Sequence, residues 1–333
     1  MTKEMVLEVK NLVKHFPVLS RGIFLKKEVG AVRAVDGVSF SVHRGETFGL
    51  VGESGCGKTS TARAILYLDP PTSGEIYFEG QEVGKIFKSK NKQEILKLRR
   101  KMQYVFQNPY ASLDPRMTVA DIIMEPLIIH KYIPKDKWHD KLYDLLAVVG
   151  LEDYHAERYP HEFSGGQRQR VCIARALAVQ PRLLIADEPV ASLDVSVRAQ
   201  ILNLLQELQS KLGITYLYIS HDLSTVKHIC HRVAVMYLGH FVEIAETEDL
   251  FNSPLHPYTQ ALLSSIPIPD PETKIPRIIL PGEVPSPINP PAGCRFRPRC
   301  IYAKEHKCIE KLPKLIDVGN GHWVACSHVR AIK

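Results

Sequence analysis

The 333-residue chain contains no apolar run close to the roughly 18 residues that a membrane-crossing helix needs. Its first residues, MTKEMVLEVK, also lack the apolar core of a secretory signal peptide. Because neither feature is present, we expect a cytoplasmic protein. Hydrophobic residues make up 45% and charged residues 24%. This composition is typical of a globular chain with one large domain or two ordinary ones.

A strong excess of charge of one sign is also absent, because the net charge is only +7. Such a charge suits an ordinary surface, a position beside anionic lipid headgroups, or binding to phosphates or nucleic acid. The basic stretch 85–101 (KIFKSKNKQEILKLRRK) has few aromatic residues that could stack on bases. It therefore indicates a solvated helical face rather than a nucleic-acid surface.

No internal repeat is visible, and the periodicity changes along the chain. Residues 5–50 alternate apolar and polar residues, which predicts an antiparallel β region that leads into a buried strand at 47–51. Short apolar runs at 183–186 and 214–219 are typical of central parallel strands. We also expect a helix over 60–70, a hairpin strand over 74–79, a helical insertion over 118–160 and a helix over 167–179. Strands that alternate with helices predict an α/β fold with a parallel-sheet core.

The composition changes after about Leu255, and residues 265–300 are dense in proline, which excludes long regular elements there. We expect one large domain over 1–255, with a helical subdomain at about 115–165. Residues 256–333 are expected to form a small, loop-rich appendage that needs a stabilising crosslink to hold its shape.

A phosphate-binding motif lies at residues 52–59, where GESGCGKT fits G-x-x-x-x-G-K-[ST] between a predicted strand and a predicted helix. Glycines at such positions let backbone N–H groups surround phosphate oxygens, and the helix N-terminus favours the anion. Lys58 is expected to contact the β- and γ-phosphates, and the Thr59 hydroxyl is expected to ligate Mg²⁺. The pattern in this context predicts a nucleotide site.

A second acidic motif follows the apolar run 183–186. Asp187 ends that run, where its carboxylate can hold Mg²⁺ through water. Glu188 is the next residue, so its side chain points elsewhere and can act as the general base on the attacking water. By itself an Asp-Glu pair after a strand is usually a cap or a surface turn. The position of this pair after residues 52–59 in the sequence is what indicates a role at the nucleotide site.

The segment FSGGQ at 163–167 resembles the signature sequence of ABC ATPases, and the remaining motifs of that family follow in order. Gln107 resembles the Q-loop glutamine, Ser192-Leu193-Asp194 the D-loop, and His221 the switch histidine. Phe16 occupies the place of the adenine-stacking aromatic. The D-loop departs from the usual pattern, since Ala191 precedes Ser192. The resemblance implies that Glu188, His221 and Gln107 act in hydrolysis, and that Thr59, Gln107 and Asp187 hold Mg²⁺. The full set expected at the nucleotide is Phe16, Gly52, Ser54, Gly55, Cys56, Gly57, Lys58, Thr59, Ser60, Gln107, Ser164, Gly165, Gly166, Gln167, Asp187 and Asp194.

The family motifs imply an ATP-binding cassette over 1–255. Beyond these general motifs, HEFSGGQRQR, HPYTQALL and PGEVPSP-x5-GCRFRPRC resemble the dipeptide and oligopeptide importer branch of this family. The resemblance implies an ATPase that powers peptide import on the inner face of the membrane. Its implied partners are two permeases, a second cassette, which is a paralogue or a copy of this chain, and indirectly an extracytoplasmic peptide-binding protein. Two cassettes would face each other head to tail, so that Ser164 and Gly166 of one close over ATP on the other. The alternative is a soluble ABC-type ATPase that acts on nucleic acid or ribosomes.

Four of the seven cysteines, Cys294, Cys300, Cys308 and Cys326, lie close together in the proline-rich region. In a reducing compartment this pattern favours a metal or cluster site over disulfides. The close C-x2–4-C pairs typical of structural zinc are absent. The wider spacing favours a [4Fe–4S] cluster, with Zn²⁺ as the second choice. Some members of the resembled branch have an iron–sulfur cluster here. Both a structural and a redox-sensing role stay open.

Overall fold

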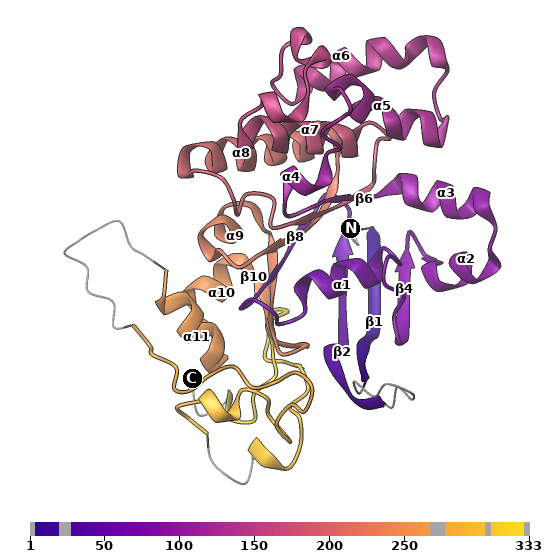
Figure 1. Ribbon diagram of the computed structural model, residues 1–333. Coiled ribbons are helices and arrows are strands. Elements are labelled where there is room, and N and C mark those ends of the chain that lie inside the picture. The colour runs from indigo at the N-terminus through magenta and orange to yellow at the C-terminus, as the bar shows by residue number, and fades with distance from the viewer. Residues whose placement is uncertain (1–3, 20–27, 267–276, 304–307, 330–333) are drawn as a thin grey trace. The chain divides into compact units, whose positions relative to one another are not determined.

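The computed structural model describes residues 4–19, 28–266, 277–303 and 308–329, which form two compact units (Figure 1). The first unit comprises Met1–Leu7, Val42–Thr47 and Phe78–Ser220, and the second comprises Glu8–Ser41, Phe48–Tyr77 and His221–Lys333. Each unit combines sheet and helix, as an α/β chain should. The predicted domain boundary after residue 255 stays a prediction, because both units are built from several separate segments.

A parallel sheet lies at the centre of the first unit. Strand β7 (Leu183–Asp187) pairs in parallel with β6 (Met102–Val105) on one side and with β8 (Thr215–Ser220) on the other. Every residue of β7 and β8 is buried, as expected for central strands whose two faces are both covered. The strands predicted at 183–186 and 214–219 are therefore confirmed.

Three helices of the first unit pack against one another: α5 (Val119–His130), α6 (Trp138–Val148) and α7 (Gly165–Leu177) (Figure 1). Helix α5 begins at a capping box in which Thr118 and Asp121 each satisfy a backbone N–H of the other. The predicted helical insertion at 118–160 consists of α5, α6 and three short 3₁₀ turns (135–137, 153–157 and 160–162). The other elements of this unit are β5 (Gln81–Glu82), α4 (Pro109–Ser112) and α8 (Val195–Leu212).

The basic stretch 85–101 forms two helices instead of one continuous face. Helix α2 (Val83–Ser89) ends at Lys90, whose φ of 56° is left-handed, and α3 (Lys92–Lys101) begins after Asn91. The Asn91 side chain accepts hydrogen bonds from the backbone of Gln93 and Glu94, which makes it a new N-cap. Most of the lysines are exposed while Leu98 is buried, as a solvated amphipathic surface requires.

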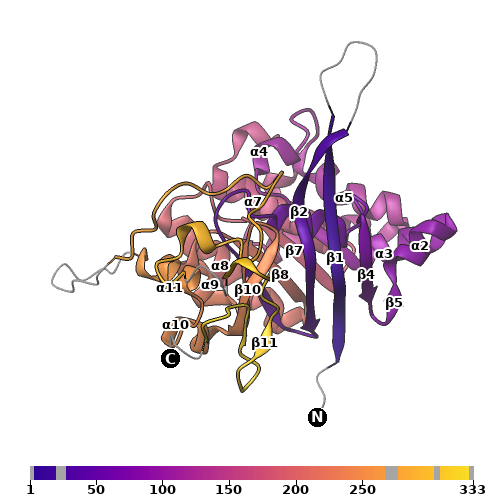
Figure 2. The same cartoon turned by 90° about the horizontal axis from the view of Figure 1, so that it is seen from below.

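Two groups of strands form the second unit. In the first group β1 (Met5–Leu19) lies between β2 (Glu28–His43) and β4 (Ser73–Phe78), as Figure 2 shows. In the second group β3 (Thr47–Val51) pairs in parallel with β9 (Arg232–Tyr237), which pairs antiparallel with β10 (His240–Glu246). The short strands β12 (Trp323–Val324) and β11 (Ile316–Asp317) continue this sheet from β10. The helices are α1 (Lys58–Ile65), α9 (Leu223–Ile229), α10 (Thr247–Asn252) and α11 (Pro257–Ser264). The strand predicted at 47–51 is confirmed.

The described residues after α11 contain little regular structure, as the proline content predicts. One cluster of buried apolar residues in this part is Leu255, Val324 and Val329, with Val318 and Cys326 packed beside it. No helix in the described part of the chain is both long enough and apolar enough to span a membrane.

A buried carboxylate joins this C-terminal part to the sheet. Glu243 of β10 is fully buried and accepts hydrogen bonds from the backbone N–H groups of Leu255 and His256, at 2.7 and 2.9 Å. Its Oε1 also lies 2.6 Å from Nε2 of His322, which is itself buried. A buried carboxylate is tolerated only when such partners satisfy it. Glu243 therefore fixes the start of α11 and the β11–β12 hairpin to one point.

We expect Glu243→Gln to lower the free energy of unfolding by about 3 kcal/mol, because one partner of a buried hydrogen-bonded pair is lost. Chemical denaturation followed by circular dichroism measures this change. Glu246→Gln is the matched control, since Glu246 lies on the same strand and is exposed. It should change stability by no more than about 0.5 kcal/mol. Equal stability of the two variants would contradict the role given to Glu243.

Candidate nucleotide site

The loop Gly52–Thr59 joins β3 to α1 in the second unit and has no room for side chains at two positions. A Cβ atom on Gly52 would lie 2.2 Å from the carbonyl oxygen of Met236, and one on Gly57 would lie 2.0 Å from that of Ala34. Both glycines also have positive φ values, 154° and 113°. Backbone contacts of this kind require glycine. The loop is therefore held by its own backbone, as a phosphate-binding loop must be.

The loop residues expected to contact a phosphate differ in their exposure to solvent. Ser54, Gly55 and Thr59 are exposed, so their backbone N–H groups and the Thr59 hydroxyl can reach a ligand. Lys58 is buried, and its Nζ donates to the carbonyl oxygens of Gly52 and Glu53 at 2.8 and 3.1 Å. The ammonium group thus lies within the curve of the loop.

Cys56 and Ser60 complete the predicted loop residues. Cys56 is buried, burial raises the pKa of its thiol, and its carbonyl oxygen accepts a hydrogen bond from the Gly239 N–H. It is a space-filling residue in this position. Ser60 is half-buried within the first turn of α1.

Two contacts to this loop were not predicted from the sequence. The Glu53 backbone N–H donates to the hydroxyl of Tyr258, and the Glu53 carboxylate pairs with Arg299. Both partners lie more than 200 positions along the chain, at separations of 205 and 246 residues. Nothing in the motif G-x-x-x-x-G-K-[ST] specifies the residue at position 53, so no local signal could have indicated these contacts.

The predicted acidic pair lies at the carboxyl end of β7 in the first unit. Asp187 is buried, and its Oδ2 accepts a hydrogen bond from the hydroxyl of Tyr104 on the neighbouring strand. Glu188 has a left-handed φ of 47°, and its N–H donates to the carbonyl oxygen of Ile219. A glutamate in this conformation is strained, and such strain is common where a side chain must point in a special direction. The two carboxylates have different partners, because that of Asp187 accepts from Tyr104 and that of Glu188 accepts from Gln107.

The structure brings together two of the predicted catalytic residues. Nε2 of Gln107 donates to Oε2 of Glu188 at 2.7 Å, although 81 positions separate the two residues. Gln107 follows β6 and Glu188 follows β7, and these strands are parallel neighbours, so their carboxyl ends meet at one edge. An amide that donates to a carboxylate restricts the direction in which that carboxylate points.

The signature segment forms the start of α7. Ser164 is the N-cap, and its hydroxyl accepts from the Gln167 N–H while the Gln167 side chain accepts from the Ser164 N–H. Gly165 is half-buried and Gly166 is buried, and a Cβ atom on Gly166 would lie 2.3 Å from Cγ1 of Val197. The exposed Ser164 therefore presents a helix N-terminus, which attracts anions.

The other predicted residues lie at element ends and on the surface. Ser192 and Asp194 are exposed, Leu193 is buried, and Asp194 is the N-cap of α8. His221 is exposed directly after β8. Phe16 is half-buried on β1, with Nζ of Lys14 4.8 Å from the centre of its ring.

The predicted site residues are divided between the two units. Phe16, the loop 52–59 and His221 belong to the second unit. The first unit contains Gln107, Asp187, Glu188, the signature segment and Asp194. The Mg²⁺ set Thr59, Gln107 and Asp187 includes residues of both units, and it stays a prediction.

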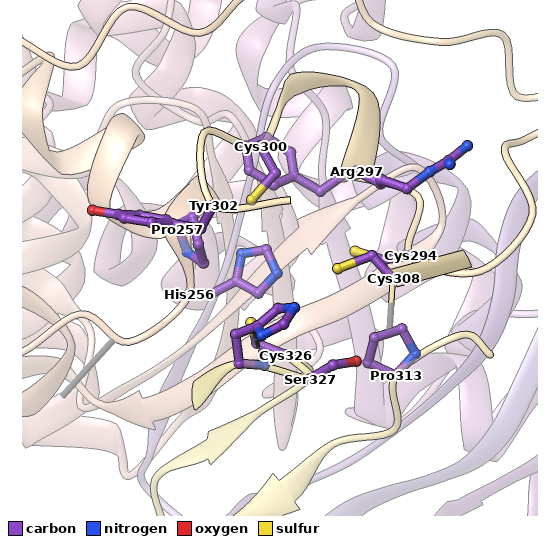
Figure 3. A pocket seen from close by; sticks show the side chains of 12 residues that line it. His256, Pro257, Cys294, Arg297, Cys300, Tyr302, Cys308, Pro313, Cys326 and Ser327 are labelled. Atoms are coloured by element: carbon purple, nitrogen blue, oxygen red, sulfur yellow. Dashed lines mark hydrogen bonds between the residues drawn. The ribbon is translucent and has the colours of Figure 1, made fainter. Parts of the chain in front are cut away.

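A second candidate site lies in the C-terminal part. Cys294, Cys300, Cys308 and Cys326 line one cavity of about 20 Å³, and Figure 3 shows their side chains around the ring of His256. All seven cysteines are thiols in the structure. Burial raises the pKa of Cys294 to about 11 and also raises the pKa of Cys300 and Cys326.

The fit of this cavity to a metal is partial. Four thiols converge from three chain segments, which is a donor set that iron–sulfur clusters and zinc both use. Among the described residues, however, no three or more His, Cys, Asp or Glu side chains are grouped so that they could hold a metal ion. A volume of about 20 Å³ holds one water molecule. The thiols would have to rearrange and lose their protons to hold a metal or a cluster.

Comparison with known proteins gives two family matches. Residues 35–191 match the ABC transporter family, and residues 242–308 match the C-terminal region of oligopeptide/dipeptide transporters. The second match includes α11 and three of the four clustered cysteines.

Relatives of similar length extend these matches over nearly the whole chain. The oligopeptide transport ATP-binding protein AppF of Bacillus subtilis is 51% identical over 97% of this chain and 97% of its own length. The dipeptide transport ATP-binding protein DppF of Escherichia coli is 49% identical over 96% of this chain and 93% of its own length.

Solved structures of ATP-binding cassettes share the fold. The cassette MJ0796, whose structure is a dimer bound to ADP and Pi, matches with a TM-score of 0.62 and 28% identity over 72% of this chain and 98% of that chain. CbiO1 of Clostridium perfringens, part of the transporter complex cbiONQ, matches with a TM-score of 0.63 and 27% identity over 75% of this chain and 92% of that chain. The nucleotide motifs, the fold and the sequence identity of about 50% over nearly the whole chain all indicate the same family. The chain belongs to the ATP-binding subunits of ABC transporters, in the oligopeptide/dipeptide branch.

Proposed function

We propose that this chain hydrolyses ATP to power the import of dipeptides or oligopeptides through partner membrane permeases. The observation that carries the hydrolytic part is the hydrogen bond between Gln107 and Glu188 at the carboxyl end of β7. The peptide substrate is supported by the names of AppF and DppF and by the match over residues 242–308. These relatives do not favour the alternative of an ATPase that acts on nucleic acid or ribosomes.

In the proposed mechanism the loop 52–59 binds the triphosphate with its backbone N–H groups and Lys58. Thr59, Gln107 and Asp187 would hold Mg²⁺, which would neutralise charge on the phosphates. Phe16 stacks on the adenine. Glu188 accepts the proton of the attacking water, and Gln107 orients the Glu188 carboxylate through the hydrogen bond between them.

The second cassette completes the site in this proposal. The exposed Ser164 and the N-terminus of α7 would contact the triphosphate bound to the facing cassette, with Gly165, Gly166 and Gln167 shaping that contact. Asp194 and His221 would act at the same interface. The dimer of MJ0796 supports this arrangement, and the partner is a paralogue or a second copy of this chain. ATP then shifts the equilibrium between open and closed pairs, because it contacts both cassettes only in the closed pair.

The proposed location is the cytoplasmic face of the membrane, where the chain contacts two permeases. An extracytoplasmic peptide-binding protein would deliver the substrate to those permeases. The position of this chain is peripheral, as expected of an ATP-binding subunit of a membrane transporter.

We further propose that Cys294, Cys300, Cys308 and Cys326 hold a [4Fe–4S] cluster, with Zn²⁺ as the second choice. The support is the donor set, since all four thiols line one cavity. Such a cluster would stabilise a proline-rich region whose described residues have little regular structure.

Glu188→Gln should lower the rate of ATP hydrolysis by about 100-fold or more, because the amide cannot accept the proton of the attacking water. Its affinity for ATP should be unchanged, and size-exclusion chromatography with ATP should show a longer-lived dimer, formed with the second cassette where the partner is a paralogue. Phosphate release and nucleotide titration measure the first two effects. Glu207→Gln is the control, because Glu207 is an exposed residue of α8 that pairs only with Lys211 among the ion pairs of the described residues. Hydrolysis at the wild-type rate in Glu188→Gln would contradict the assigned base.

Protein purified without oxygen should be brown, absorb broadly near 400 nm and contain about four iron atoms per chain. Cys308→Ser should lose the colour and the iron. Cys172→Ser is the control, because Cys172 is buried in the first unit and lies outside the cavity. Colourless protein that contains zinc, or no metal at all, would reject the cluster.

A further inference from the structure

The segment that joins Cys294 to Cys300 also contacts the phosphate-binding loop. Nη1 of Arg299 lies 2.9 and 3.2 Å from the two carboxylate oxygens of Glu53, the second residue of that loop. The Arg299 side chain is only 10% exposed and that of Glu53 is 28% exposed. The pair is therefore largely withdrawn from water, which strengthens its attraction over that of a surface pair.

Helix α11 provides a second contact to the same residue. The hydroxyl of Tyr258 accepts the Glu53 backbone N–H at 2.9 Å. Tyr258 is fully buried, and its ring packs edge-on against Tyr237, with 4.7 Å between the ring centres, and also contacts Phe296. A hydroxyl on a ring packed in this way has little freedom, so it fixes the backbone at Glu53.

A second arginine of the segment holds the strands that flank the loop. Arg295 is buried and donates to the carbonyl oxygen of Leu238 and to the carboxylate of Asp36. Hydrogen bonds from His240, Arg295 and His15 keep the pKa of Asp36 well below its usual range. The carboxylate therefore stays charged, and the segment 294–300 is anchored at two separate points.

The negative charge of Glu53 links its contact with Arg299 to the binding of a triphosphate. A carboxylate within a loop that binds a triphosphate repels the ligand unless a cation neutralises it. Arg299 supplies that cation and at the same time fixes the direction of the Glu53 side chain. Glu53 occupies a variable position of the nucleotide-binding motif, and Arg299 lies outside the motif.

We propose that Arg299 and Tyr258 are positioning residues of the nucleotide site: the C-terminal appendage sets the affinity for MgATP by neutralising and holding Glu53. This inference rests on the proposed nucleotide binding. It assigns to the appendage a role in the ATPase reaction that is separate from any metal at the four cysteines.

The test measures the dissociation constant of MgATP, KM and kcat for single and double variants of the full chain. Arg299→Gln should raise the dissociation constant and KM by about three- to tenfold, with kcat nearly unchanged, because an unpaired Glu53 repels the triphosphate. The double variant Glu53→Gln/Arg299→Gln should recover most of the lost affinity, since it removes that repulsion. Arg277→Gln is the control, because Arg277 is an exposed arginine of the same C-terminal part.

Two further variants separate binding from folding. Arg299→Lys keeps the charge and should bind MgATP more tightly than Arg299→Gln, and thermal unfolding of each variant shows whether it is folded. Tyr258→Phe keeps the packed ring but removes the acceptor for the Glu53 N–H, so it should also weaken MgATP binding.

Several results would overturn the inference. These are wild-type affinity in Arg299→Gln or in Tyr258→Phe, or a double variant that binds as weakly as Arg299→Gln. The last result would mean that Arg299 acts on the nucleotide directly. Failure of the proposed function is distinguishable, because the wild-type chain itself would then neither bind nor hydrolyse ATP.

Discussion

The close approach of backbone to backbone at the loop 52–59 is the constraint on which the nucleotide site depends. Gly52 and Gly57 pack against the carbonyl groups of Met236 and Ala34 without space for a Cβ atom. These two carbonyls belong to β9 and to β2, so the strands around the loop define its shape. A loop held in this way needs no rearrangement to present its N–H groups, which is the condition for strong binding of a charged ligand.

Much of the fold could be predicted because its helices and strands are encoded by patterns within short sequence segments. The strand at 47–51, the apolar runs at 183–186 and 214–219 and the helix expected over 167–179, which is observed as α7, are each determined by local burial or periodicity. The break between α2 and α3 was missed because the left-handed turn at Lys90 has no glycine to mark it. Local composition alone could not show that Asn91 starts a new helix.

The site could be predicted only in part, for a physical reason. The resemblance to ABC ATPases identified Gln107, and the order after residues 52–59 identified Glu188. Parallel pairing of β6 and β7 brings the two side chains together. The Tyr104 contact to Asp187 and the Arg299 contact to Glu53 join positions 83 and 246 residues apart. Partners this distant are selected by the three-dimensional packing, and the residue types at those positions carry no local periodicity that would reveal them.

The C-terminal part is held in place by directed polar contacts as well as by apolar packing. Glu243 satisfies two backbone N–H groups at the start of α11 and pairs with His322 beside the β11–β12 hairpin. Directed polar contacts of this kind replace part of the stabilisation that hydrophobic burial gives elsewhere. They also fix orientation, which non-directional burial does not.

That fixed orientation matters because the appendage contacts the loop through charge. A guanidinium neutralises Glu53 only if it stays within a few ångströms, since the attraction falls with distance and with exposure to water. Arg295 and Arg299 lie in a seven-residue segment that begins and ends at a cysteine of the four-thiol cavity. Arg295 anchors this segment at Asp36 and Leu238, and Tyr258 reaches the loop from a helix whose start is fixed by Glu243. The electrostatics of the phosphate-binding loop therefore depend on residues more than 200 positions beyond it, and the loop and the appendage act as one structure within the second unit.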